Sequence, residues 1–141
     1  MTPCVNNYPN NLNAWLIYGP FSLQGAAAAE VTFWRWQRSE AGYDLLRWMA
    51  SVDGQNFYGI QDSGDSGGWV AETFNLSNVY TLGDLQGRSQ VWIGFQFLSD
   101  GDINDQGAFL DEVVVRKRVG GALASPGAGG VGRSPAQARR P

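Results

Sequence analysis

Residues 89–98 alternate between two kinds of side chain, and this alternation constrains the fold more than any other feature of the chain. From residue 91 onward, one side of the segment takes only large apolar residues: Val91, Ile93, Phe95 and Phe97. A period of two residues is typical of a β-strand with one face against a core. The segment therefore predicts a strand in a half-buried sheet.

A second local signal predicts a hairpin. Residues 43–52 and 56–60 are rich in strand-forming side chains and flank Asp53-Gly54, a dipeptide with easy access to positive φ. Further strands are expected over residues 14–18, 30–36, 69–74 and 108–115. These strands are separated by turn residues, and no helical period of comparable strength is found.

The composition agrees with this pattern. The chain has 141 residues, which suits one domain, and its 19 Gly, 13% aromatic residues and 16% charged residues favour short strands joined by turns. The sequence predicts an all-β, two-layer antiparallel jelly-roll sandwich over residues 14–118. Residues 1–13 are expected to be an irregular lead-in, and residues 119–141, rich in Gly, Ala, Pro and Arg, a disordered tail.

The charge distribution narrows the possible partners. Residues 1–115 hold all thirteen acidic residues of the chain but only four of its ten basic residues, a net charge of −9. An acidic surface repels phosphates and suits cations, so no nucleic acid partner is expected. No apolar stretch approaches the roughly 18 residues of a membrane span. Residues 1–3 open no signal peptide, so an export signal is expected upstream in a longer parent, unless the chain is a fragment.

Catalysis is not expected. The chain has no His, which removes the usual base of a Ser or Cys triad, and Cys4 has no evident activating partner and no second Cys with which to form a disulfide. An enzyme that hydrolyses glycans with a pair of carboxylates remains an alternative, because thirteen acidic residues offer many pairs.

Four segments resemble a known kind of domain. Residues 15–23, 51–57, 91–95 with 99–101, and 107–113 are together similar to the jelly-roll domains that follow the catalytic part of immune inhibitor A metalloproteases, with a looser likeness to MAM domains. The resemblance implies an extracellular or cell-surface location and covalent attachment to larger parent domains. It also implies a structural calcium ion between an early strand and the last one, and no catalysis.

The expected calcium ligands are Glu40, Asp44 and Asp111, which match the acidic positions that the resemblance implies. Calcium takes six to eight oxygen ligands, so its site needs acidic residues from separate segments. Asp111 also falls on the same side of its strand as Phe109 and Val113, where a charge needs compensation. Alternatively, Asp111 caps a turn or accepts backbone hydrogen bonds.

A second acidic segment, residues 100–105, has the letters DGDIND. It lacks the Glu that an EF-hand places at its twelfth position, and strands flank it. We expect a solvated acidic loop there, with a second weak ion site as the alternative.

Four aromatic residues form a candidate ligand surface: Trp34, Trp36, Tyr58 and Trp69. Sugar rings stack on such side chains, which would make the chain a carbohydrate-binding module; the alternative is ordinary core and edge packing. The function expected first is a non-catalytic, calcium-stabilised accessory or adhesion module of an exported bacterial protein. Its partners would be covalently linked parent domains or cell-surface glycans.

Overall fold

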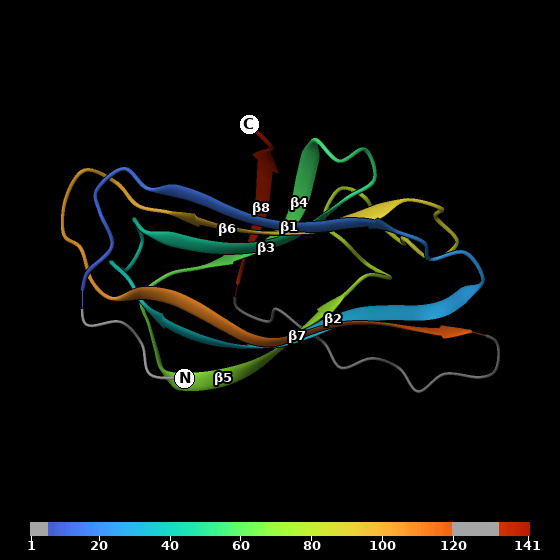
Figure 1. Ribbon diagram of the computed structural model, residues 1–141, viewed down its shortest axis with the longest axis horizontal. Helices are drawn as coiled ribbons and strands as arrows, with labels where there is room; N and C mark the ends of the chain where they lie inside the picture. Colours follow the sequence, from blue (N-terminus) through green and yellow to red (C-terminus); the bar gives the residue numbers. More distant parts are fainter. Residues whose placement is uncertain (1–5, 120–132) are drawn as a thin grey trace.

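The computed structural model describes residues 6–119 and 133–141, and these residues form two facing sheets. The strands are β1 (Asn13–Phe21), β2 (Ala26–Arg38), β3 (Leu45–Ser51), β4 (Asn56–Asp62), β5 (Asp65–Asn75), β6 (Val91–Leu98), β7 (Gly107–Val119) and β8 (Ser134–Arg139). One sheet has the order β1-β6-β3-β4-β8 and the other the order β5-β2-β7 (Figure 1). All strand pairs are antiparallel. The prediction of an all-β, two-layer antiparallel sandwich is confirmed.

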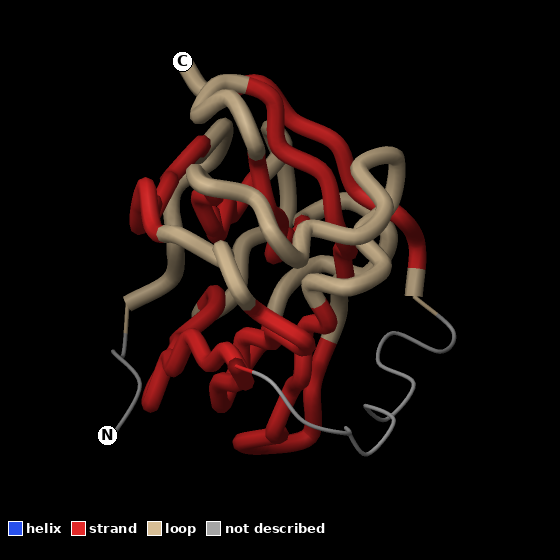
Figure 2. Tube along the Cα trace, turned by 90° about the vertical axis from the view of Figure 1, so that its right-hand side faces the viewer, coloured by secondary structure: helices blue, strands red, loops and turns tan. Residues whose placement is uncertain are grey.

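Figure 2, turned by 90°, shows strands and loops along the described part of the chain and no helix. Accordingly, residues 6–119 and 133–141 contain no helix with the length and apolar character needed to cross a membrane.

Two antiparallel strand pairs, one in each sheet, connect the two layers of the sandwich. β1 pairs with β6 in one sheet, and β2, which follows β1, pairs with β7, which follows β6, in the other. Asn13 at the start of β1 lies opposite Leu98 at the end of β6, while Arg38 at the end of β2 lies opposite Gly107 at the start of β7. Residues 6–12, the β2–β3 loop and the β6–β7 loop therefore meet at one end of the sandwich.

The core forms where the alternating strands face each other. The predicted apolar side of β6 is buried, with Val91 fully covered and Phe97 9% exposed. Phe33 of β2 lies between the sheets, and its ring contacts Trp48 and Phe95 edge-on at centroid distances of 5.7 and 5.0 Å. Each such buried aromatic side chain contributes about 1.5–3 kcal/mol to folding, so this cluster holds the two sheets together.

The predicted hairpin is confirmed as β3, β4 and the turn between them. Gly54 takes a φ of 75°, in the left-handed region that Gly enters at low cost. The Asp53 carboxylate accepts hydrogen bonds from the amides of Gln55 and Asn56 and from the Asn56 side chain, each 2.8 Å long. These bonds favour the charged form and hold the pKa of Asp53 well below its usual range.

The C-terminal residues differ from the expected disordered tail. Ser134–Arg139 form β8, which pairs with β4 from Gln61 opposite Ser134 to Asn56 opposite Arg139. The prediction rested on the lack of apolar residues, whereas backbone hydrogen bonding to an edge strand needs few of them. Residues 120–132, the rest of the expected tail, lie outside the described residues.

Candidate metal site

Three carboxylates from two loops meet at the end of the sandwich where β2, β3 and β6 terminate or begin. Glu40 and Asp44 lie in the β2–β3 loop and Asp100 lies just after β6. One carboxylate oxygen from each lies within 4.8 Å of the other two. Asp44 is completely buried and the other two are partly buried. We call Glu40, Asp44 and Asp100 the acidic site.

A tight turn places the two loop carboxylates side by side. The backbone carbonyl of Glu40 accepts hydrogen bonds from the amides of Tyr43 and Asp44 at 3.3 and 3.0 Å. The Ser39 hydroxyl donates to the Asp44 carbonyl at 3.0 Å. Because these bonds close the turn, Glu40 and Asp44 are presented together to the β6–β7 loop.

Asp44 joins three segments. Its Oδ1 accepts a hydrogen bond of 2.9 Å from the amide of Asp100, and its Oδ2 accepts one of 2.5 Å from the hydroxyl of Tyr8. The Tyr8 ring packs edge-on against Phe97 at 4.9 Å. Burial, followed by this hydrogen bond to Asp44, raises the pKa of Tyr8 to about 12. Tyr8 therefore stays a hydrogen-bond donor at neutral pH, and it fixes the orientation of the Asp44 carboxylate.

Glu40 is the carboxylate without a partner. Its Oε2 is buried and makes no hydrogen bond within residues 6–119 and 133–141. Burial, and then repulsion by Asp100, Asp44 and Asp102, raise the pKa of Glu40 above its usual value. A buried carboxylate oxygen among like charges is costly, and a bound cation would relieve that cost.

The donor atoms of the acidic site suit a hard cation. All three side chains offer carboxylate oxygens, which calcium and magnesium prefer, whereas thiolate and imidazole ligands suit zinc and copper. Calcium takes six to eight oxygens, so backbone carbonyls and water would have to complete the shell around these three groups. The three carboxylates can bind a cation, whose positive charge would offset their negative charges, and the residues fit a calcium ion.

The structure brings together two of the three predicted ligands and separates the third. Asp111 is exposed on β7, and its Oδ1 accepts a hydrogen bond of 2.8 Å from the amide of Glu112. The reason is a β-bulge at Glu112, where φ is 49° and one residue of β2, Phe33, opposes two of β7, Glu112 and Val113. The inward side chains before the bulge are Ala108 and Leu110. Asp111 therefore lies on the outer side of β7 and apart from the acidic site, whereas simple alternation predicts it on the inner side.

Asp100 is the candidate ligand that is absent from the predicted set, because the first expectation for residues 100–105 is a solvated loop, with a second weak ion site as the alternative. The signal that could identify Asp100 is the pairing of β3 with β6. Leu45 of β3 lies opposite Leu98 of β6, so the residue before β3 and the second residue after β6 become neighbours. That pairing brings Asp44 and Asp100 together.

The aromatic residues of the candidate ligand surface divide between the sheets. Trp34 and Trp36 of β2 alternate with buried residues and point outward, and Trp69 of β5 lies opposite Trp36. Tyr58 lies on β4 in the other sheet and packs against the core and Tyr80, so the structure does not bring it together with the three Trp residues. Trp36 is flanked by Trp69 on β5 and by Phe109 on β7. The ring centroids of Trp36 and Phe109 are 5.6 Å apart.

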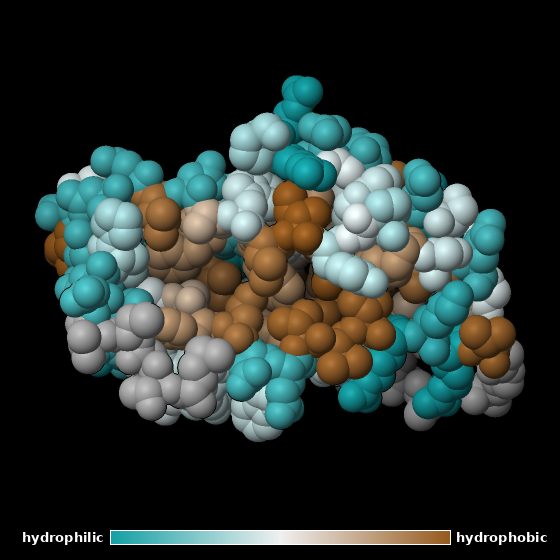
Figure 3. Space-filling model, in the orientation of Figure 1, coloured by the Kyte–Doolittle hydropathy of each residue, from teal (hydrophilic) through white to brown (hydrophobic). Residues whose placement is uncertain are grey.

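An apolar groove of about 520 Å³ opens along one side of the sandwich, between edge strands β1 and β7. Figure 3 shows hydrophobic side chains gathered along this side. The groove is lined by Leu16, Tyr18, Ile93, Phe95, Val113 and Val114, together with Ile17 and Val115. Leu16 and Tyr18 are 58% and 60% exposed, so this side of the molecule presents apolar surface to solvent.

Comparison of the sequence with protein-family models and with curated proteins gives no match.

Proposed function

We propose that this chain is a non-catalytic accessory or adhesion module of an exported protein, stabilised by one calcium ion in the acidic site. The observation that carries the proposal is the unpartnered, buried Oε2 of Glu40 beside Asp44 and Asp100. A cation there would satisfy that oxygen and offset the mutual repulsion of the three carboxylates.

The ion would hold together the loops at one end of the sandwich. It would link the β2–β3 loop to the β6–β7 loop directly, and it would reach residues 6–12 through the hydrogen bond from Tyr8 to Asp44. These segments lie outside the strand ladders. A ligand that binds only the folded chain stabilises it by about 2.7 kcal/mol at a hundred times its Kd.

The accessory role is proposed from two further observations. The chain contains no His, and the grouped carboxylates lie in loops that also supply their structural hydrogen bonds. The exported location and the attachment to parent domains are proposed from the resemblance of the four segments described above.

Thermal denaturation in millimolar calcium and in excess chelator tests the ion. We expect calcium to raise the melting temperature of the unsubstituted chain and of Asp111→Asn, the matched control for a carboxylate outside the acidic site. Asp100→Asn should lose the increase. Equal melting temperatures with calcium and with chelator in the unsubstituted chain would contradict the proposal.

Carbohydrate binding is a second candidate, favoured by the outer face of the β5-β2-β7 sheet. Trp69, Trp36 and Phe109 occupy one row across its three strands, and Trp34, 42% exposed, stands two residues along β2. Aromatic rings that do not serve the core, in a row with polar groups nearby, are suited to stacking sugar rings. Asp111 lies opposite Trp34 and would provide such a polar group.

Affinity electrophoresis in gels that contain soluble polysaccharides tests this second candidate. The unsubstituted chain should be retarded, and Trp34→Ala and Trp69→Ala should each abolish the retardation. Tyr43→Ala, which removes an aromatic side chain that is 65% exposed in the β2–β3 loop, is the control and should leave it unchanged. Equal mobility of all four chains with and without polysaccharide would exclude this role for the polysaccharides used.

A further inference from the structure

The C-terminal strand β8 is attached to the sandwich by two kinds of contact. Its backbone pairs with the edge of β4 over six residues. Of its side chains, Ala136 is buried against Met49 and Phe57, while Ser134, Pro135 and Gln137 are exposed. In Figure 1, β4 and β8 stand side by side and cross the direction of β3. β8 therefore contributes little apolar burial of its own.

Arg133, the residue before β8, supplies a charged anchor. Its guanidinium bonds to Asp62 at 3.2 Å and to Glu72 at 2.6 Å, and it lies over the Trp48 ring at 5.5 Å. Arg35 contacts the same two carboxylates and the same ring. We call Asp62, Glu72, Trp48 and Arg35 the arginine pocket.

The arginine pocket is complementary in charge to an incoming guanidinium. Asp62 and Glu72 carry two negative charges against the single positive charge of Arg35, and Glu72 is only 6% exposed. Arg133 makes the pocket neutral. Because a buried carboxylate short of partners is costly, the pocket favours occupation by a second guanidinium.

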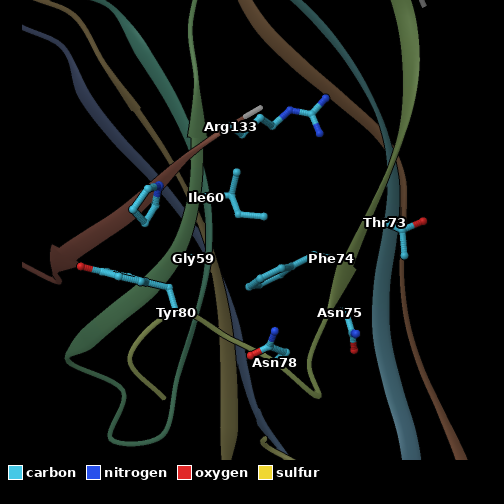
Figure 4. A pocket seen from close by; sticks show the side chains of 9 residues that line it. Gly59, Ile60, Thr73, Phe74, Asn75, Asn78, Tyr80 and Arg133 are labelled. Carbon is cyan, nitrogen blue, oxygen red and sulfur yellow. The ribbon is translucent and has the colours of Figure 1, made fainter. Parts of the chain in front are cut away.

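The anchor is not enclosed by the core. Two hollows, of about 280 and 190 Å³, lie beside Arg133, and its side chain is 24% exposed. Figure 4 shows the larger hollow, with Arg133 at one end and Tyr80 and Asn78 at the other. β8 and Arg133 can leave without opening the sandwich, as low-stability edge elements do.

We propose that the β4 edge and the arginine pocket form a binding site for the segment Arg133–Arg139 of a second copy of this chain. Every contact of β8 within its own chain is available in the same form between two copies, which is the condition for strand exchange. Thirteen residues separate Val119 from Arg133, and a chain of that length spans up to about 45 Å, more than the roughly 30 Å width of a small domain. The site uses no residue of the acidic site.

Cysteine cross-linking in a Cys4→Ser background tests the exchange on the full chain. Asn56 and Arg139 lie opposite each other in the ladder, and both are exposed. Opposed strand residues have Cα atoms about 4.5–5.5 Å apart, within the range of about 4.4–6.8 Å that a disulfide bridges. Asn56→Cys in one chain and Arg139→Cys in a second, size-tagged chain are mixed at high concentration and oxidised mildly.

We expect a disulfide-linked heterodimer on a non-reducing gel, at a yield about tenfold above that of Asn56→Cys mixed with a tagged Tyr43→Cys. Adding Arg133→Ala to the tagged donor should reduce the yield to that control level. The chain that carries both Asn56→Cys and Arg139→Cys should close within itself on dilution, which shows that the geometry permits the bond. A heterodimer yield no greater than the control, insensitivity to Arg133→Ala, or failure of the double variant to close would each overturn the proposal.

Discussion

At the scale of single residues, Glu40 links stability to pH and to calcium. Its pKa is raised in the ion-free chain, so the folded state binds its proton more tightly than the unfolded state does. Stability therefore falls as the pH rises from the ordinary value of 4.5 through the raised pKa, and it stays lower above that range.

Glu40→Gln should accordingly raise the melting temperature in chelator at neutral pH, because it removes a repelled charge, and it should abolish the increase caused by calcium. The advantage should shrink toward about pH 4, below the ordinary pKa of 4.5, where Glu40 is mostly protonated in both states. Melting curves in chelator at the two pH values check this. A lower melting temperature for Glu40→Gln in chelator at neutral pH would contradict the account of the site.

The pKa of Asp53 is shifted in the opposite direction to that of Glu40, so its contribution to stability changes with pH in the opposite way. Its pKa is lowered by its hydrogen bonds in the β3–β4 turn, so its contribution is fully present above the ordinary value of 3.8 and is lost as the pH falls below it. Asp53→Ala should cost about 1 kcal/mol at neutral pH, measured by urea denaturation, and Asp53→Asn should cost less because it keeps an acceptor oxygen. A urea midpoint of Asp53→Ala equal to that of the unsubstituted chain would show that the turn does not need these bonds.

At the scale of elements, the distance between β4 and β3 depends on Gly59, which lies opposite Met49 in the ladder. A Cβ atom on Gly59 would lie 2.1 Å from the carbonyl oxygen of Trp48 and 2.7 Å from the Cα of Met49. Only Gly allows the close approach of β4 to β3 at this point.

Gly59→Ala should therefore push β4 away from β3 and destabilise the chain by at least about 2–3 kcal/mol. Gly101→Ala is the matched control, since a Cβ there meets only the side-chain oxygen of Asn11 at 3.7 Å. Urea denaturation of both variants gives the comparison. Similar midpoints for the two would mean that β4 relaxes around the added methyl group.

At the scale of the whole molecule, local patterns predict individual strands, whereas pairing between strands far apart in the sequence determines where the candidate site residues lie. The alternation around Phe95 and the Asp53-Gly54 turn were enough to predict β6 and the β3–β4 hairpin, because their signals lie within ten residues. The outward position of Asp111 depends on a bulge against β2, and the place of Asp100 depends on the pairing of β6 with β3. β8 depends on the edge of β4 and on the arginine pocket, which no local pattern reveals.

Isothermal titration of calcium into the chelator-stripped chain tests the central claim most directly. The acidic site is expected to take one ion per chain, and Asp111→Asn should do the same because Asp111 lies apart from it. Glu40→Gln should show no comparable binding heat, since it replaces the carboxylate that has no other partner. Absence of binding by the unsubstituted chain at millimolar calcium, or equal binding by Glu40→Gln, would contradict the account.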